Sequence, residues 1–116
     1  MTRVLLIEQD NVTAQRFGFR CLEQGMAVVI AESVCEGVRI LATTPVSMIV
    51  ADFGRFWLGV HEQAALFERV APGVPVIVTV APDFPLETRV ALELDGFRVT
   101  PAPPEPEDLL KMLASA

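Results

Sequence analysis

Short, almost wholly apolar runs recur along the chain at spacings of roughly 20 to 28 residues. They cover residues 3–7, 27–31, 47–51 and 75–80, and a weaker run at 97–100 follows Gly96. Runs of this length that are rich in valine and isoleucine, with polar or turn residues on either side, are typical of buried β-strands. The pattern therefore predicts five strands.

The segments between these runs carry apolar residues at helical spacing, which predicts five helices. The positions expected to face the core are Ala14, Phe17, Cys21 and Leu22, then Val34, Val38 and Leu41, then Val60, Ala64, Phe67 and Val70, then Leu86, Val90, Ala91 and Leu94, and finally Leu109, Leu110 and Leu113. Ser33 and Glu36 have the spacing of a capping box at the start of the second helix. Gln63 interrupts the third apolar stripe, and the sequence offers no reason for it.

Strands that alternate with helices and are themselves almost wholly apolar indicate a parallel sheet covered on both faces. The fold class is therefore α/β, with three layers and right-handed crossovers. The proline-rich segment 101–106 is expected to close the turn before the last helix rather than to link two domains. We expect a single domain over residues 1–116.

The composition removes several classes of function. The 116 residues are 52% hydrophobic and 21% charged, and no apolar run approaches the roughly 18 residues that a membrane span needs. Glu8 and Asp10 interrupt the first apolar run, so the start of the chain does not resemble a signal peptide and we expect a cytoplasmic protein. The net charge of −6 would repel phosphate backbones. We therefore expect binding neither to nucleic acid nor to a membrane.

The cysteines and the single histidine do not suggest a metal site. Cys21 and Cys35 stand at positions that read as helical, without the spacing of a zinc motif. We expect both to be buried free thiols. His61 falls near the start of the third helix, where we expect a solvated side chain with no base as partner.

Polar residues gather where two of the predicted strands end. Asp52 ends the third strand, and Glu8, Gln9 and Asp10 follow the first. In parallel sheets the working site lies beyond the carboxyl ends of the strands, where the strand order reverses. If the order is the flavodoxin-like 2-1-3-4-5, the first and third strands are neighbours. Glu8, Asp10 and Asp52 would then converge on one crevice.

With these features, the chain resembles the receiver (CheY-like) domain of bacterial two-component response regulators over essentially its whole length. The segments that carry the resemblance are VLLIE at residues 4–8, MIVAD at 48–52, PVIVTVA at 75–81 and ALEL at 91–94. The resemblance implies a flavodoxin-like (βα)5 sandwich that acts in signal transduction and is not an enzyme. It also implies that Asp52 is the position of the phosphoryl acceptor, and that the bond between Ala102 and Pro103 is cis.

Four positions depart from the family pattern. The family holds magnesium with an acidic pair, and the second member of that pair here is Gln9. Alignment places Val80 at the hydroxyl position of the fourth strand, with Thr79 one residue early and so on the opposite face. Ala102 takes the place of the lysine, and Val99 the place of the aromatic residue three positions before it.

These departures lead us to expect a degenerate, or pseudo-, receiver. The chain has a single lysine, Lys111, in the last predicted helix, and a lysine there cannot reach the crevice. We expect no cofactor, with magnesium bound weakly, if at all, by Glu8, Asp10 and Asp52. Asp52 and Glu8 would then be inherited carboxylates without reactivity.

Two other interpretations stay open at this point. In the first, the domain is a functional phosphoacceptor in a phosphorelay, with magnesium at Glu8, Asp10 and Asp52 and with Arg55 in place of lysine. In the second, the crevice binds a small molecule. That interpretation ranks last, because the loops lack a glycine-rich phosphate-binding pattern.

The expected partners are proteins: an output domain, or a histidine kinase. Arg89, Glu93, Asp95 and Arg98 fall on the fourth helix and fifth strand, which resemble the dimer surface of some response regulators. A homodimer and an ordinary charged surface are both compatible with that pattern. Phe56 and Trp57, in the loop after Asp52, form either an exposed contact for a partner or a loop packed onto the third helix.

Overall fold

The computed structural model describes residues 1–114 and contains the five strands and five helices that the sequence predicts. The strands are β1 (Thr2–Ile7), β2 (Met26–Ala31), β3 (Met48–Asp52), β4 (Val76–Val80) and β5 (Arg98–Pro101). The helices are α1 (Asn11–Glu23), α2 (Val34–Leu41), α3 (Val60–Val70), α4 (Leu86–Leu94) and α5 (Pro106–Ala114), and a short 3-10 turn, η1 (Phe53–Arg55), follows β3. Within residues 1–114, no helix combines the length and the apolar character of a membrane span.

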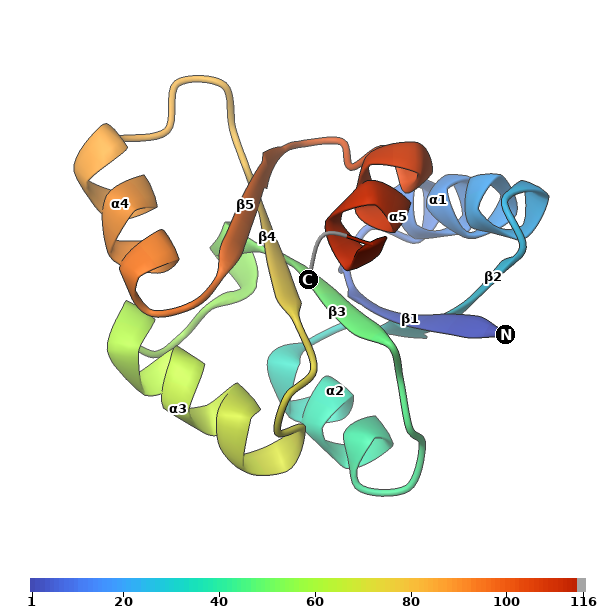
Figure 1. Cartoon of the computed structure of the whole chain (residues 1–116), viewed down its shortest axis with the longest axis horizontal. Helices are drawn as coiled ribbons and strands as arrows, with labels where there is room; N and C mark the ends of the chain where they lie inside the picture. The colour runs from blue at the N-terminus through green and yellow to red at the C-terminus, as the bar shows by residue number, and fades with distance from the viewer. Residues whose placement is uncertain (115–116) are drawn as a thin grey trace.

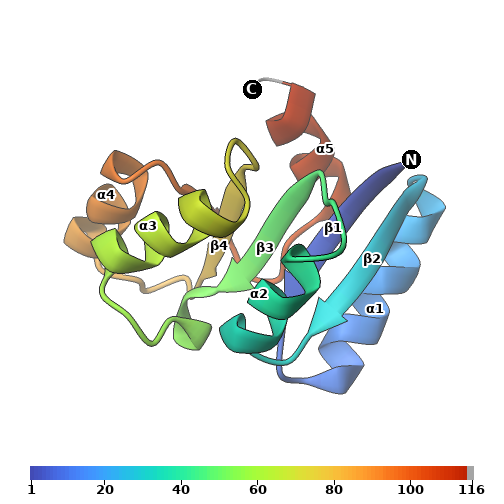
Figure 2. The same ribbon diagram turned by 90° about the horizontal axis from the view of Figure 1, so that it is seen from below.

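The strands form one parallel sheet in the order β2-β1-β3-β4-β5, which confirms the predicted topology (Figure 1). Helices α1 and α5 cover one face of the sheet, and α2, α3 and α4 cover the other (Figures 1 and 2). The proline-rich segment joins β5 to α5, as predicted, and the bond between Ala102 and Pro103 is cis.

The core lies in two layers, one on each face of the sheet. In β3, Met48 and Val50 belong to the layer under α1 and α5, while Ile49 and Ala51 belong to the layer under α2, α3 and α4. Successive side chains of a strand project to opposite faces. A strand buried on both faces must therefore be apolar at every position, which explains the uninterrupted apolar runs in the sequence.

Helix α4 buries a different side from the one predicted. Leu86, Val90 and Leu94 are 71%, 47% and 83% exposed, whereas Leu92 is fully buried. Residues two apart on an α-helix point about 200° away from each other. The helix therefore packs on the sheet through Leu92, and Leu86, Val90 and Leu94 form an exposed row, called the α4 stripe below.

Two smaller predictions about burial are also wrong. Leu22, at the edge of the apolar side of α1, is 59% exposed, because it is rotated by about 100° from the buried Cys21. Cys35 is exposed near the start of α2, next to the buried Val34. Only Cys21 is a buried thiol, and burial raises its pKa to about 11.

Helix α2 packs close to the sheet. The Ser33 hydroxyl accepts a hydrogen bond from the Glu36 backbone N–H at 3.1 Å, as a capping box requires. The Glu36 carboxylate accepts from the N–H of Glu32 rather than from that of Ser33. A side chain at Gly37 would begin 3.1 Å from the Ile7 side chain, so the missing Cβ lets the helix approach β1.

Gln63 is fully buried in α3, one turn from Phe67. Within the described part of the chain, neither its side-chain oxygen nor its side-chain nitrogen has a hydrogen-bond partner. An unpaired buried amide is unfavourable, because it loses its hydrogen bonds to water without replacing them. We therefore expect this residue to lower the stability of the domain.

Candidate phosphoacceptor site

Asp52 and Glu8 lie at the same edge of the sheet. Ile7 of β1 pairs with Ala51 of β3. Glu8 directly follows Ile7, and Asp52 directly follows Ala51. The carboxyl ends of neighbouring parallel strands meet at one edge. The register therefore places both residues at the edge of the sheet where the crevice was predicted.

The Asp52 carboxylate accepts two hydrogen bonds. Its Oδ2 accepts from the Gly54 backbone N–H at 2.9 Å, which caps η1. Its Oδ1 accepts from the Thr79 hydroxyl at 3.2 Å. Both oxygens are therefore engaged by groups of the protein, and the side chain is held in one orientation.

The expectation that Thr79 points away from Asp52 is wrong. Thr79 lies directly opposite Asp52 in the register of β3 and β4. Paired residues of neighbouring strands project to the same face, so the hydroxyl of Thr79 reaches the carboxylate. Val80, which the alignment placed at the hydroxyl position, is buried in the core layer on the opposite face.

The acidic residues after β1 are occupied by local hydrogen bonds. The Glu8 carboxylate accepts from the backbone N–H groups of Gln9 and Asp10, at 2.8 and 3.3 Å. Asp10 is the N-cap of α1 and accepts from both the backbone N–H and the hydroxyl of Thr13. The hydrogen bond from the Thr13 hydroxyl holds the pKa of Asp10 below its usual value.

These acids do not form a compact cluster of ligands. Among residues 1–114, no group of three or more His, Cys, Asp and Glu side chains is arranged so that it could hold a metal ion. The oxygen donors at Glu8 and Asp52 are of the type that magnesium prefers. The use of Asp10 as a helix cap leaves the crevice with fewer free carboxylate oxygens than its sequence suggests.

Arg55 lies at this edge of the sheet, but its contact is with Gln9. Its guanidinium nitrogen Nη1 donates a hydrogen bond to the Gln9 side-chain oxygen. Gln9 stands where the family has its second acidic residue. The amide at this position therefore accepts from the cation that was expected to replace lysine.

The end of β5 supplies no cation to the crevice. The Ala102 backbone N–H donates to the Val80 carbonyl at 3.0 Å, and the residue precedes the cis proline Pro103. Val99 packs partly buried in the layer under α2, α3 and α4. The only lysine, Lys111, is exposed on α5.

Known response regulators resemble this chain in sequence and in fold. The chain is 32% identical to the transcriptional regulatory protein GlrR of Escherichia coli over 78 residues, which are 67% of this chain and 18% of that protein. The CheY-like receiver domain protein of Methanospirillum hungatei superposes with a TM-score of 0.81 at 20% identity, over 99% of this chain and 92% of that one. No family model matches the chain.

The chain has the fold of a CheY-like receiver domain, and its sequence resembles that of a response regulator. A further solved structure is a response regulator from Burkholderia pseudomallei with a phosphorylated aspartic acid, a calcium ion and citrate. It superposes with a TM-score of 0.80 at 21% identity, over 97% of this chain and 66% of that one. The chain spans less than a fifth of the length of the curated relative GlrR.

The loop that follows Asp52 in this receiver domain is anchored by aromatic side chains. Phe53 lies 4.9 Å from Phe84, and Phe56 lies 5.4 Å from Phe97 and 6.2 Å from Phe67, measured between ring centroids. We call these five residues the phenylalanine cluster. Phe56 packs onto α3, as one of the two sequence interpretations of the loop predicts, while Trp57 is 64% exposed. The other interpretation, a contact for a partner, stays a prediction.

Each of the four charged residues of the predicted partner face has a hydrogen-bond or ion-pair partner within the domain. Arg89 and Glu93 pair with each other on the surface of α4 at 3.0 Å. Arg98 donates to the Met112 carbonyl of α5. Asp95 accepts from His61 Nδ1 of α3 at 2.9 Å.

The prediction for His61 is therefore correct in its exposure but wrong in its lack of a partner. Asp95 is 34 residues away along the chain, and only the packing of α3 near the end of α4 brings the two together. The hydrogen bond from the Asp95 carboxylate raises the pKa of His61. No spacing in the sequence could have indicated this pair.

Proposed function

We propose that this receiver-type domain signals through protein contacts, with phosphorylation of Asp52 lost or much reduced. The observation that carries the proposal is the absence of an ammonium group from the crevice, since Ala102 occupies the lysine position and Lys111 is on α5. An aspartyl phosphate at this edge would lack the cation that neutralises it.

The hydrogen bonds of the site support the same proposal. Asp52 already accepts from Gly54 and Thr79, and Asp10 serves as a helix cap. A carboxylate attacks a phosphoryl group well only when a hard cation draws the donor's oxygens toward it. Here the oxygens that could hold magnesium are Glu8 and Asp52, with a backbone carbonyl completing the set in the family. Magnesium would supply charge neutralisation, and Gln9 removes one of its ligands.

The surface for the partner is the α4 stripe. Leu86, Val90 and Leu94 form a continuous apolar row that faces solvent, beside the ion pair of Arg89 and Glu93. Exposed apolar rows with a polar rim mark protein-binding surfaces. We propose that this row docks onto an output domain or another signalling protein, and that a second copy of the chain is the alternative occupant.

A second function is favoured by one observation, the hydrogen bond from the Thr79 hydroxyl to Asp52. The Thr79 hydroxyl therefore lies beside Asp52, whereas the sequence alignment placed Val80 at the hydroxyl position. In this alternative, Asp52 accepts a phosphoryl group with magnesium at Glu8 and Asp52, and Arg55 leaves Gln9 to neutralise the product. The planar guanidinium is a poor geometric substitute for an ammonium, so we rank this second.

One experiment separates the two functions. The protein is incubated with acetyl phosphate, or with beryllofluoride, in millimolar magnesium, and the Asp52→Ala variant is the control. We expect no adduct by intact mass and no change in the amide NMR signals of Gly54 and Thr79. An adduct that disappears in Asp52→Ala would overturn the proposal and make Arg55→Ala the next variant to test.

A further inference from the structure

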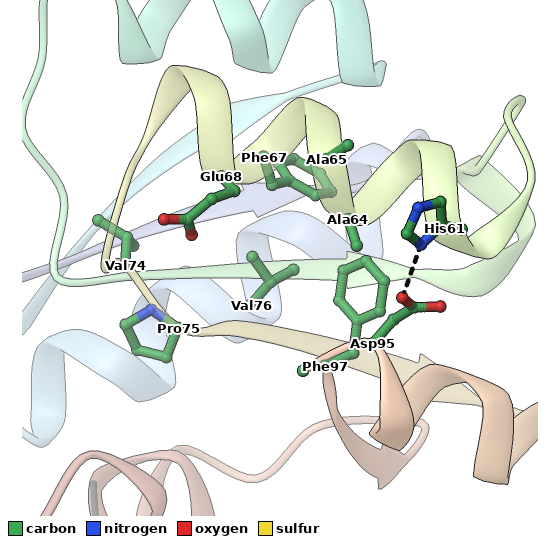
Figure 3. A pocket seen from close by; sticks show the side chains of 11 residues that line it. His61, Ala64, Ala65, Phe67, Glu68, Val74, Pro75, Val76, Asp95 and Phe97 are labelled. Carbon is green, nitrogen blue, oxygen red and sulfur yellow. Dashed lines mark hydrogen bonds and ion pairs between the residues drawn. The ribbon is translucent and has the colours of Figure 1, made fainter.

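A pocket of about 330 Å³ lies between α3 and the start of β4 (Figure 3). It opens between α3 and the segments that lead into β4 and β5, so it is at the amino ends of these strands. Its apolar lining consists of Ala64, Phe67, Val74, Pro75, Val76 and Phe97. Nothing in the phosphoacceptor chemistry uses this pocket, so its role does not depend on the reactivity of Asp52.

The aromatic lining of the pocket is rigid before anything binds. Phe67 and Phe97 meet edge to face with ring centroids 6.3 Å apart, and both also contact Phe56. They are only 2% and 5% exposed, so neighbouring side chains fix their positions. A preformed apolar surface binds a side chain without the cost of ordering its own residues.

Acidic groups stand at both ends of the pocket. Glu68 extends from α3 toward Val74 at one end, and the Asp95 carboxylate lies beside His61 at the other (Figure 3). Among the described residues, Glu68 has no hydrogen-bond or ion-pair partner. His61 is the only basic residue in the lining, and it is already bound to Asp95. The pocket is therefore complementary to an apolar group that carries a positive charge beside it.

We propose that this pocket binds a segment of a partner protein in which an apolar side chain is next to an arginine or lysine. The apolar side chain would lie against the partly exposed Ala64, Val74 and Pro75, over the rigid floor made by Phe67 and Phe97. The cation would pair with Glu68. The volume is near the lower limit of the roughly 300 to 1,000 Å³ of small-molecule sites, which suits one side chain of a peptide better than a whole metabolite. The net charge of −6 would also attract a basic partner.

The test uses two dipeptides as probes of opposite charge on the isotope-labelled full chain. N-acetyl-Phe-Arg-amide should shift the amide NMR signals of Glu68, Gly96 and Phe97 in a saturable way at millimolar concentrations. N-acetyl-Phe-Glu-amide should bind at least about tenfold more weakly, because its charge is repelled. Glu68→Gln should weaken binding of the arginine probe by about two- to fivefold, as expected for one exposed ion pair.

Two further variants keep the test decisive. Glu23→Gln removes the same charge on α1, on the other face of the sheet, and should leave binding unchanged. Ala65→Phe fills the mouth of the pocket from an exposed position and should abolish binding while the spectrum stays well dispersed. Equal binding of the two dipeptides, binding that survives Ala65→Phe, or no shifts at Gly96 and Phe97 would each overturn the proposal.

Discussion

At the scale of single residues, hydrogen bonds hold the side chains of the predicted site around Asp52. Asp52 is held by Gly54 and Thr79, while Gln9 takes the hydrogen bond of Arg55. Each of these side chains therefore has a hydrogen-bond partner within the protein.

Gln63 gives the clearest stability prediction at this scale. Gln63→Met keeps an unbranched side chain of similar size and removes the buried amide that has no partner. We expect the free energy of unfolding to rise by about 1 to 3 kcal/mol, measured by urea denaturation. Gln15→Met, at an exposed position of α1, is the matched control and should change stability by less than about 0.5 kcal/mol. A destabilised Gln63→Met would mean that the amide has a partner that supports the fold.

At the scale of elements, helices α3 and α4 are joined through His61 and Asp95. The hydrogen bond from Asp95 raises the pKa of His61, so the protonated imidazole is favoured in the folded state. Stabilisation by this pair is fully present below the ordinary pKa of histidine, and it is lost as the pH rises through the raised pKa of the folded protein. The pair is exposed, so this is a modest effect on stability.

Substitution of Asp95 tests that link. In Asp95→Asn, the pKa of His61 should fall toward its ordinary value, read from the imidazole proton signals in an NMR pH titration. His61 is the only histidine, so its signals are identified without assignment. Glu62→Gln removes one negative charge close to His61 without breaking the hydrogen bond, and should move the pKa less. An unchanged pKa in Asp95→Asn would show that the pair is absent in solution.

Helix α4 gives a second prediction at the same scale. Its residues Leu92 and Leu94 are two positions apart, and the first is buried while the second is exposed. Leu92→Ala removes a fully buried side chain and should cost about 2 to 5 kcal/mol of unfolding free energy. Leu94→Ala should change stability by less than about 0.5 kcal/mol, since that side chain is 83% exposed. Equal losses in the two variants, measured by urea denaturation, would contradict the orientation of α4. A stable Leu94→Ala protein is also the right reagent for a test of partner binding through the α4 stripe.

At the scale of the whole molecule, the sheet separates three surfaces that can act independently. The Asp52 crevice is at the carboxyl ends of the strands, the pocket beside Phe97 is at their amino ends, and the α4 stripe is on the outside of α4. Loss of phosphorylation at the first would leave the other two intact. The incubation with a phosphodonor therefore tests the reactivity of Asp52 and does not test the two proposed docking surfaces.

The sequence by itself determined the fold. Apolar runs at strand length, separated by helical stripes, can be satisfied only by a parallel sheet buried on both faces, and each strand lies within one residue of its predicted bounds. The position of Asp52 at the end of a strand could also be predicted directly, since it depends on order along the chain. The presence of a single lysine, Lys111, is likewise a property of the sequence alone.

Only the tertiary structure decided which side chains meet. The register of β3 against β4 brings Thr79 to Asp52, and the tilt of α4 exposes Leu94 while it brings Asp95 to His61. Helical periodicity indicates an apolar side, but the rotation of a helix on the sheet depends on the shapes of all its neighbours. Packing fixes the contacts between residues that are far apart in sequence, and a local pattern of residues cannot predict them.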